Sequence, residues 1–378
     1  MERNDRKIMF VLPLICKQPT GGVKVVLDYA NRLQSDGYEV SVVYAIVHPE
    51  KLLRITEDGF DTSMRATVSG LCKLGFRGWL RLAKWMISGK SDYSSRSWYN
   101  LNENVKEHFV ISLNYTKKLD ADIYIATACT TAPYVADYPS GKKKFYFIQE
   151  YENWVMNDKE LNATYSLPLK KIVISRWLSN TLSRNRHDST VVPNGFDDSQ
   201  FYITTPIEKR NRFSVSVMYH IRPTKDFATS LKALKIVHDK YPQLTVKMFG
   251  VYDTEEKMPE WIDFHKSPTH EEHLAINNES SIYLASSVTE GWGLTIGEAM
   301  MCGQAVVCTA AEGFLEMAVN EENALVSPVR NSEMLANNII RLIEDDDLRV
   351  KIARQGLDDI KKFTVDKSYA KFKEIVTL

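Results

Sequence analysis

Residues 289–300 read TEGWGLTIGEAM, and they carry the strongest structural signal in the chain. The glycines at 291 and 293 let the backbone approach another group closely, and the residues that follow have helical character. Apolar runs typical of buried strands stand on either side, at 282–285 and 305–307. A strand, a glycine loop, a helix and a second strand together predict a parallel α/β sheet.

The same alternation extends through the rest of the chain. In the second half, further strand-like runs lie at 215–218, 244–249 and 325–326, with helical segments such as 227–238 and 332–343. In the first half, such runs lie at 8–15, 40–44, 123–126, 145–148 and 172–174. Runs that are almost wholly apolar are typical of strands covered on both faces. The sequence therefore predicts an α/β fold with two Rossmann-like halves.

Two domains are also expected from length, because a chain of 378 residues exceeds the size at which one hydrophobic core usually keeps growing. The segment 191–197, VVPNGFD, interrupts the β/α pattern with turn-forming residues. We therefore expect an N-terminal domain over residues 1–200 and a C-terminal domain over 201–360.

Composition excludes several classes of protein. Lys and Arg total 48 and so do Asp and Glu, which gives no reason to expect a nucleic acid partner. The five cysteines are odd in number and include no C-x-x-C pair, which argues against zinc and against a disulfide framework. The apolar run at 8–15 is too short for a signal peptide or a membrane span. A cytoplasmic location in a reducing compartment is the expectation.

Two carboxylates frame the glycine loop. Glu290 and Glu298 are separated by seven residues, and we expect them just before the helix and within its first turn. Free backbone N–H groups at a helix start favour an anion such as a nucleoside diphosphate. Carboxylates accept hydrogen bonds from hydroxyl groups, so one can hold a sugar and the other a ribose. Alternatively, Thr295 and Glu298 spell a capping box that only satisfies the helix start. Residue chemistry alone does not choose between these roles.

The order E-G-x-G-L-x-x-x-E-A within 290–299 resembles the E-x7-E signature of family 4 of the retaining glycosyltransferases. The resemblance covers essentially the whole chain. Thr20-Gly21-Gly22 is similar to the glycine-rich loop after the first strand of that family. Residues 193–197 resemble its interdomain junction, and Lys225 resembles its phosphate-binding lysine.

The resemblance implies the GT-B fold, in which two Rossmann-like domains face each other across a cleft that holds the active site. The C-terminal domain would bind a nucleoside diphosphate sugar, and the N-terminal domain an acceptor. Residues 361–378 would form a helix that packs back on the N-terminal domain. Gly21 and Gly22 would lie on the donor side. Neither a cofactor nor a metal is expected.

The resemblance also implies roles for the residues of the signature. Glu290 would contact the donor sugar and Glu298 the ribose. The backbone amides around Gly293, Leu294 and Thr295 would contact the diphosphate.

Physical chemistry also supports a phosphate-binding role for Lys225, independently of the resemblance. A phosphate leaving group gains negative charge as its bond to the sugar breaks, and a nearby cation stabilises that charge. Without the resemblance, a solvated surface lysine explains the same residue.

The chain departs from the common family pattern beside this lysine. His220 stands where an arginine is usual, five residues before Lys225, and Arg222 lies three residues before it. Arg222 as a second cation, His220 as a hydrogen-bond donor, and a structural role for either are the alternatives.

A second departure lies in residues 147–154, FIQEYENW, where many relatives carry a histidine that faces the donor sugar. Gln149 occupies the similar position. The stretch looks like one found in bacterial surface-polysaccharide transferases, including some rhamnosyltransferases. Gln149 is therefore a candidate catalytic residue and Glu150 a candidate on the acceptor side. An ordinary polar loop after a strand is the alternative.

Residues 76–87 place Arg77, Arg81 and Lys84 on one helical face and large apolar side chains elsewhere. We expect a core helix with a solvated basic face, and peripheral contact with the inner face of a membrane is the alternative. The basic run at 142–144 is expected to be a solvated turn, with an anionic-lipid patch as the alternative.

Taken together, these residues predict a retaining, metal-independent hexosyltransferase. It would move a hexosyl or 6-deoxyhexosyl group from a UDP- or dTDP-sugar to a glycan or lipid-linked glycan, in bacterial surface polysaccharide or glycoconjugate synthesis. The alternative is a non-catalytic partner or chaperone of an active glycosyltransferase, which the presence of Glu290 and Lys225 disfavours. A dinucleotide-dependent dehydrogenase is disfavoured because no G-x-G-x-x-G follows the first strand.

Overall fold

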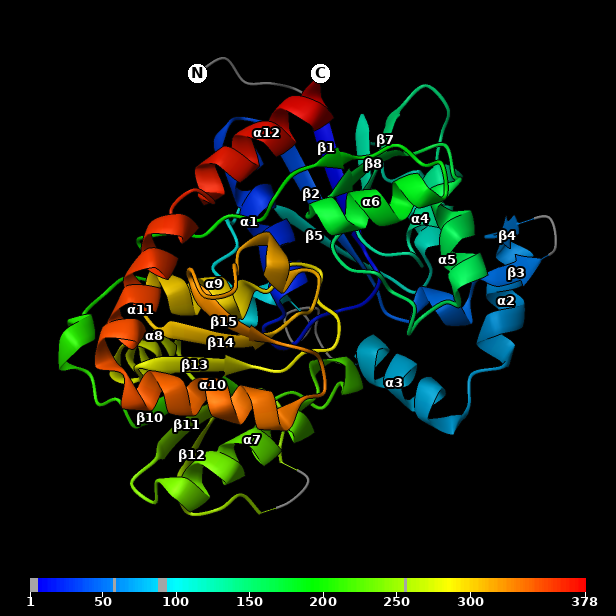
Figure 1. The fold of residues 1–378 in the computed structure, drawn as a ribbon. Coiled ribbons are helices and arrows are strands. Elements are labelled where there is room, and N and C mark those ends of the chain that lie inside the picture. The colour runs from blue at the N-terminus through cyan, green and yellow to red at the C-terminus, as the bar shows by residue number, and fades with distance from the viewer. Residues whose placement is uncertain (1–5, 57–58, 88–93, 255–256) are drawn as a thin grey trace. The chain divides into compact units, whose positions relative to one another are not determined.

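The computed structural model describes residues 6–56, 59–87, 94–254 and 257–378, and the side chain of Arg81 lies outside the described part. Contacts divide the chain into two compact units. Unit 1 contains the described residues up to Val192 together with Tyr369–Leu378, and unit 2 is Pro193–Ser368. Each unit is built on its own parallel sheet (Figure 1).

The sheet of unit 1 has the strand order β5-β2-β1-β6-β7-β8-β9, with every neighbouring pair parallel. Its strands are β1 (Lys7–Leu12), β2 (Glu39–Ala45), β5 (Lys106–Val110), β6 (Ile123–Ala126), β7 (Lys143–Ile148), β8 (Lys170–Val173) and β9 (Thr190–Val191). The central strands β1 and β6 are buried over almost their whole length. Their continuous apolar sequence matches this position, because helices cover both faces of such a sheet.

The sheet of unit 2 has the order β12-β11-β10-β13-β14-β15 and is also parallel throughout. Its strands are β10 (Ser214–Met218), β11 (Thr245–Gly250), β12 (Ile262–Lys266), β13 (Ile282–Ala285), β14 (Ala305–Thr309) and β15 (Ala324–Ser327). The strand order reverses between β10 and β13, as it does between β1 and β6 in unit 1. Ligands of such sheets bind beyond the carboxyl ends of the strands at this reversal.

The helices complete both layers. In unit 1 they are α1 (Gly21–Ser35), α2 (Met64–Cys72), α3 (Phe76–Ile87), α4 (Ala132–Ala136), α5 (Asp158–Tyr165) and α6 (Arg176–Arg184). In unit 2 they are α7 (Phe227–Lys240), α8 (His270–Glu279), α9 (Leu294–Met301), α10 (Ser332–Glu344) and α11 (Asp346–Ile360). The last helix, α12 (Val365–Thr377), begins in unit 2 and ends in unit 1. The α/β architecture predicted from the sequence is confirmed.

Some strands were not predicted because they carry little apolar sequence. The edge strands β5 and β12 read KEHFV and IDFHK, so three of the five residues in each are polar. An edge strand has a neighbour on one side only and needs fewer apolar side chains. The short antiparallel hairpin of β3 (Arg54–Thr56) and β4 (Gly59–Asp61) was missed for the same reason.

The chain passes from unit 1 to unit 2 after residue 192 and returns to unit 1 after residue 368. The domain boundaries expected from the sequence were residues 200 and 360. Residues after Pro193 already belong to unit 2 because Phe196 packs on α9, where a Cβ on Gly297 would stand 2.0 Å from its ring. Helix α11 stays in unit 2 and packs against α9 and β14.

The unit 1 part of α12 packs through one aromatic side chain above all. The ring of Phe372 lies 4.5 Å from that of Tyr29, 5.4 Å from that of Phe147 and 6.1 Å from that of Phe10, centre to centre. Phe372 is fully buried. The last residues of the chain are therefore part of the hydrophobic core that the first strand begins.

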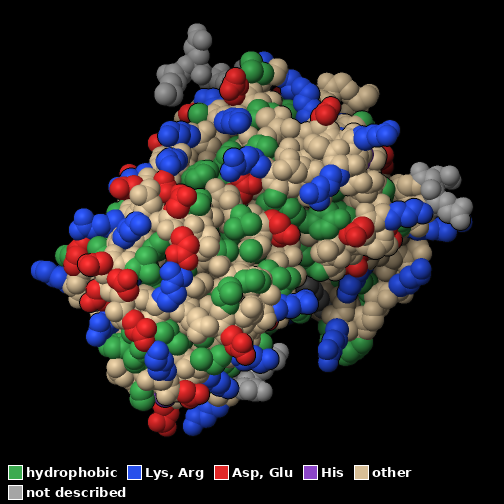
Figure 2. All heavy atoms as spheres, in the orientation of Figure 1, with side chains coloured by type: hydrophobic (Ala, Val, Ile, Leu, Met, Phe, Trp, Pro, Cys, Tyr) green, Lys and Arg blue, Asp and Glu red, His purple; other side chains and the backbone are tan. Residues whose placement is uncertain are grey.

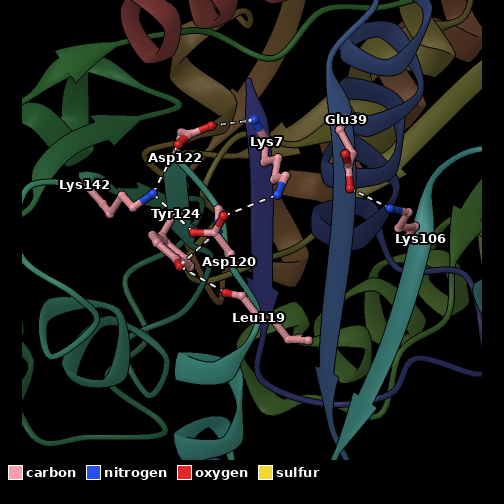
Figure 3. Close-up of polar contacts among 9 residues, drawn as sticks. Lys7, Glu39, Lys106, Leu119, Asp120, Asp122, Tyr124 and Lys142 are labelled. Carbon is pink, nitrogen blue, oxygen red and sulfur yellow. Dashed lines mark hydrogen bonds and ion pairs between the residues drawn. The ribbon is translucent and has the colours of Figure 1, made fainter. Parts of the chain in front are cut away.

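Charged side chains join the amino ends of the strands in unit 1. Figure 3 shows Lys7, Asp120, Asp122 and Lys142 pointing toward one another. The ammonium of Lys142 lies 3.2 Å from a carboxylate oxygen of each aspartate, and that of Lys7 lies 3.3 Å from Asp120. Lys142, and after it Lys7, holds the pKa of Asp120 below its usual range. This end of the sheet is opposite to the ligand-binding end.

The basic run at 142–144 is engaged in such contacts along its whole length. Lys143 donates a hydrogen bond to the carbonyl of Thr377, and Lys144 donates to the carbonyls of Ala136 and Tyr138. These lysines therefore hold unit 1 together, which leaves the interpretation as an anionic-lipid patch without support.

The expectation that residues 76–87 form a core helix is wrong. The segment is helical, but Phe76 and Ile87 are 78% and 87% exposed, and Trp79, Leu80 and Met86 are exposed as well. Only Leu82 among its large apolar side chains is buried. The helical spacing was correctly identified, but periodicity does not reveal whether anything packs on the apolar face.

Candidate functional site

The candidate site of unit 2 lies where its strand order reverses. Lys225 ends a short 3-10 helix that follows β10, and Glu290 lies in the loop that follows β13. These two strands are hydrogen-bonded neighbours, so the loops at their carboxyl ends meet. The fold therefore brings together two residues that are 65 positions apart in sequence.

Lys225 and Glu290 form an ion pair. The Lys225 Nζ lies 2.6 Å from Glu290 Oε1, and the two side chains are only 18% and 9% exposed. Ser287 Oγ donates a second hydrogen bond, of 2.7 Å, to the same carboxylate oxygen. A charge-assisted bond in such a sheltered place is stronger than one at the surface.

The backbone around Lys225 is fixed by a tight turn. Asp226 has a left-handed conformation with φ of 45°, which ends the 3-10 helix and starts α7. Ser286 Oγ donates a 2.7 Å hydrogen bond to the Asp226 carbonyl. The turn is therefore attached to the end of β13, which keeps the lysine beside Glu290.

Helix α9 begins immediately after this loop and has no side-chain cap. Its N-cap residue is Gly293, with φ of 103° and no capping hydrogen bond from a side chain. A Cβ at that position would also stand 2.5 Å from the ring of Phe314, so both conformation and space require glycine. The N–H groups of the first turn, from Leu294 and Thr295 among others, are the donors that a helix leaves without intrahelical partners.

The capping-box alternative for Thr295 and Glu298 is excluded by where the helix starts. A capping box needs its threonine at the N-cap and its glutamate three residues later. Here Gly293 is the N-cap, so Thr295 is the second residue of α9 and Glu298 the fifth. Glu298 therefore lies just past the first turn, not within it as expected, and it is buried.

A narrow pocket opens beside the ion pair. It is lined by Met218, Lys225, Ser230, Tyr283, Leu284, Ala285, Ser286, Ser287, Glu290, Thr295 and Phe314. The lining brings a cation, a carboxylate and the start of α9 to one place. Such a set can bind an anion and a hydroxyl group side by side.

His220 is held as a neutral ring. Its Nδ1 accepts a 2.9 Å hydrogen bond from the backbone N–H of Arg222, so in the neutral ring the hydrogen is on Nε2. Burial, and after it the positive charges of Lys225 and Arg222, lowers the pKa of His220 to about 4. At neutral pH His220 therefore offers one hydrogen-bond donor and no positive charge. Of the two candidates before Lys225, only the half-buried Arg222 is a cation.

The candidate residues of unit 1 also come together. Gly21 and Gly22 are the first residues of α1, whose N-cap Thr20 makes no capping hydrogen bond through its side chain. Gln149 follows β7, and its Nε2 donates a 3.1 Å hydrogen bond to the carbonyl of Gly22. Glu150 is the next residue and is half-buried. The glycine loop is therefore in direct contact with Gln149, the residue that stands where many relatives carry a histidine.

Sequence reasoning missed the residues that support these groups. Glu152 accepts a 2.6 Å hydrogen bond from the backbone N–H of Cys129 and so orders the loop after β6, at the strand reversal of unit 1. Ser287 supports Glu290 as described. Glu152 was visible in the sequence as an acidic residue two positions after Glu150. Its partner Cys129 lies 23 positions away, and no sequence pattern predicts that contact or the one between Ser287 and Glu290.

The described residues offer neither a metal site nor a membrane-spanning helix. They contain no group of histidine, cysteine, aspartate and glutamate side chains that could hold a metal ion. No helix among them is long and apolar enough to cross a membrane.

Comparison with known proteins places the C-terminal part of the chain in a family. Residues 205–359 match the family model for "Glycosyl transferases group 1". The phosphatidyl-myo-inositol mannosyltransferase of Mycolicibacterium smegmatis is 21% identical, over 94% of this chain and 90% of its own length. An N-acetylgalactosaminyltransferase of Campylobacter jejuni that acts on N,N'-diacetylbacillosaminyl-diphospho-undecaprenol is 30% identical, over 22% of each chain.

Solved structures show the same fold over the whole chain. Sucrose-phosphate synthase from Thermosynechococcus elongatus has a TM-score of 0.70 at 14% identity and covers 98% of both chains. The Anabaena protein HepE, solved with UDP-glucose, has a TM-score of 0.69 at 16% identity and covers 98% of this chain and 99% of its own. Residues 205–359 thus form a group 1 glycosyltransferase domain, and the chain is a glycosyltransferase of the GT-B fold.

Proposed function

We propose that the enzyme is a retaining hexosyltransferase that moves a hexosyl or 6-deoxyhexosyl group from a UDP- or dTDP-sugar to a glycan acceptor. The observation that carries this proposal is the sheltered pair of Lys225 and Glu290 beside the uncapped start of α9. A nucleotide sugar offers an anionic diphosphate and a neutral, hydroxyl-rich ring, and the site offers matching groups for both.

In this proposal the diphosphate binds between Lys225 and the amides of Gly293, Leu294 and Thr295. A phosphate oxygen takes over the ammonium hydrogen bond that Glu290 holds in the free protein. Glu290 is then released to accept hydrogen bonds from the hydroxyl groups of the sugar. Replacement of one partner by another keeps both charges satisfied, which a buried pair requires.

Departure of the diphosphate is helped by the same positive groups. Charge grows on the leaving oxygen as the bond to the anomeric carbon breaks, and Lys225, Arg222 and the helix amides stabilise it. The Nε2–H of His220 adds a neutral hydrogen bond. These groups provide the positive charge that a metal ion would otherwise supply, so we propose that the reaction needs none. Retention of configuration at the anomeric carbon rests on the E-x7-E resemblance.

Glu298 is proposed to hold the ribose. Its position inside α9 removes the capping role that competed with this function. The UDP-glucose bound to HepE and the hexose named for the mannosyltransferase support a nucleoside diphosphate hexose as donor.

The acceptor is assigned to unit 1. Gln149, which donates a hydrogen bond to Gly22, and Glu150 offer amide and carboxylate groups that bind hydroxyl groups. The donor role of Gly21 and Gly22 rests on the family resemblance. We propose a bacterial surface glycan or a lipid-linked glycan as acceptor and a cytoplasmic site of action. The mannosyltransferase and the N-acetylgalactosaminyltransferase described above are both named for lipid-linked acceptors.

The experiment is a panel of UDP-, dTDP- and GDP-sugars, scored by slow donor hydrolysis and by thermal shift. At least one UDP- or dTDP-sugar should raise the melting temperature and be hydrolysed. Stabilisation without hydrolysis or transfer would favour the non-catalytic partner, and no response to any donor would contradict the transferase.

A further inference from the structure

The segment from Thr62 to Ile87 has an unusual charge pattern. It contains Arg65, Lys73, Arg77, Arg81 and Lys84 but no aspartate or glutamate. The rest of the chain nearly balances its charges, because the whole protein is neutral. Helices α2 and α3 lie within this segment. The segment therefore carries a local excess of positive charge, and Figure 2 shows lysine and arginine side chains at the lower right, where Figure 1 places α2 and α3.

The same segment exposes many large apolar side chains. More than a third of those that the described part of the chain leaves exposed come from residues 62–87. They are Met64, Val68, Phe76, Trp79, Leu80, Met86 and Ile87. Isolated exposed apolar residues are ordinary, but a gathered set marks an interaction surface.

Leu82 is the buried apolar anchor of helix α3. Leu74 packs beneath the start of the helix, 3.2 Å from where a Cβ on Gly78 would stand. The exposed residues Phe76, Trp79, Leu80, Met86 and Ile87 recur at steps of three, four and seven residues, so they form one apolar stripe.

Basic side chains lie beside that stripe. At 3.6 residues per turn, Arg77 and Lys84 lie beside the edge of the stripe to which Phe76 and Leu80 belong. Both are exposed. A stripe of phenylalanine, tryptophan and leucine with basic residues on its border is the arrangement of helices that lie in a lipid headgroup region.

We propose that α2 and α3 dock this enzyme on an anionic lipid surface. The apolar stripe enters the boundary between headgroups and acyl chains, and Arg65, Lys73 and Arg77 contact lipid phosphates. Charge complementarity selects this occupant, since a second copy of the same surface would bring like charges together. The docking is independent of the transferase chemistry.

The test is co-flotation of the full chain with vesicles. Vesicles of equal parts phosphatidylglycerol and phosphatidylcholine should bind the protein, and phosphatidylcholine alone should bind it weakly. Substitution of Arg77→Gln should weaken binding by roughly five-fold, and further basic substitutions should multiply this effect. The pair Phe76→Ser and Trp79→Ser should weaken binding by at least about ten-fold. Added salt should weaken the binding of wild type more than that of Arg77→Gln.

Helix α7 offers matched controls in unit 2. Ile236 is an exposed apolar residue and Lys235 an exposed basic residue next to it. Ile236→Ser and Lys235→Gln should leave vesicle binding unchanged. All variants should keep the wild-type melting curve and the wild-type rate of donor hydrolysis, which separates failure of docking from failure of folding or of the transferase.

Three results would overturn the proposal. One is equal binding to vesicles with and without phosphatidylglycerol. Another is unchanged binding of the Phe76→Ser, Trp79→Ser protein. The third is a stable dimer in sedimentation that these substitutions dissociate, because it would show that the stripe binds a second copy.

Discussion

At the scale of single residues, Glu298 lies buried inside α9, past its first turn. The pattern T-x-x-E left a structural cap and a ligand contact equally open, because both use the same residue types. A left-handed glycine two residues before Thr295 removes the cap. No spacing rule contains that information, because Phe314, which also requires glycine there, lies 21 positions further along the chain.

Substitution of Glu298→Gln removes no helix cap, so it should weaken UDP binding more than it lowers stability. Loss of a charged hydrogen bond to a ribose hydroxyl costs about 1.5 kcal/mol or more, which is at least about ten-fold in affinity. Titration calorimetry and a melting curve on the same protein give both numbers. A lower melting temperature with unchanged UDP affinity would instead assign Glu298 to the fold.

His220 should make stability depend on pH in a predictable direction. Its folded pKa of about 4 is below the usual 6.5, so between these values the unfolded chain binds more protons than the folded one. Stability therefore falls as pH drops from 6.5 to 4, and the penalty is complete below 4, at roughly 1–3 kcal/mol. Above pH 6.5 the ring is neutral in both states and contributes no pH dependence.

The measurement is urea unfolding of wild type and His220→Gln at pH 7 and pH 4.5. The variant should lose less stability than wild type between the two values. An equal loss in both proteins would mean that His220 titrates normally in the folded state. Because the ring is neutral at pH 7, a pH–rate profile should show no ionisation of His220 between pH 6 and 8.

At the scale of secondary-structure elements, long apolar strands and periodic helices were predictable, and polar edge strands were not. Strands β10 and β13 were identified because burial on both faces demands apolar residues. Arg210 shows what sequence cannot reveal. This buried guanidinium donates hydrogen bonds to carbonyls at the ends of α8 and α9, including those of Asn277 and Cys302. In sequence it is one of many basic residues.

Gly293 tests whether the start of α9 has the geometry described. Gly293→Ala combines a positive φ with a clash against Phe314, so it should lower stability by on the order of 2 kcal/mol or more and weaken UDP binding. Gly141 is the matched control, because its φ is 80° and a Cβ there meets nothing within 4 Å. Gly141→Ala should cost less stability and leave UDP affinity at the wild-type value. Equal effects at both positions would contradict the steric argument.

At the scale of the whole molecule, the chain leaves unit 1 at Val192 and returns to it with α12. The return depends on Phe372, which packs against Tyr29 and Phe147. The family resemblance implied a helix that returns to the N-terminal domain. It did not show which of its side chains are buried, because α12 interleaves apolar residues with charged ones.

Phe372→Ala should therefore lower the free energy of unfolding by about 3–5 kcal/mol. The exposed Ile236, changed to Ala on α7, should cost far less. Denaturant unfolding of both variants measures the difference. Similar losses in the two proteins would show that α12 is not packed on unit 1 as described.

The central claim is that Lys225 and Glu290 divide one donor between them, the lysine taking the diphosphate and the glutamate the sugar. The most direct test compares Lys225→Met and Glu290→Gln for UDP affinity and for turnover of the UDP- or dTDP-sugar that the panel selects. The exposed ion pair of Lys247 and Glu279, in the same unit, supplies the matched controls Lys247→Met and Glu279→Gln.

Lys225→Met should weaken binding of the nucleoside diphosphate by at least about ten-fold. Glu290→Gln should bind it nearly as well as wild type, but turn over the donor sugar slower by on the order of 100-fold. Both control variants should match wild type in affinity and rate. If Lys225→Met and Glu290→Gln instead bind and turn over the donor like the controls, the pair is structural and the proposed site is contradicted.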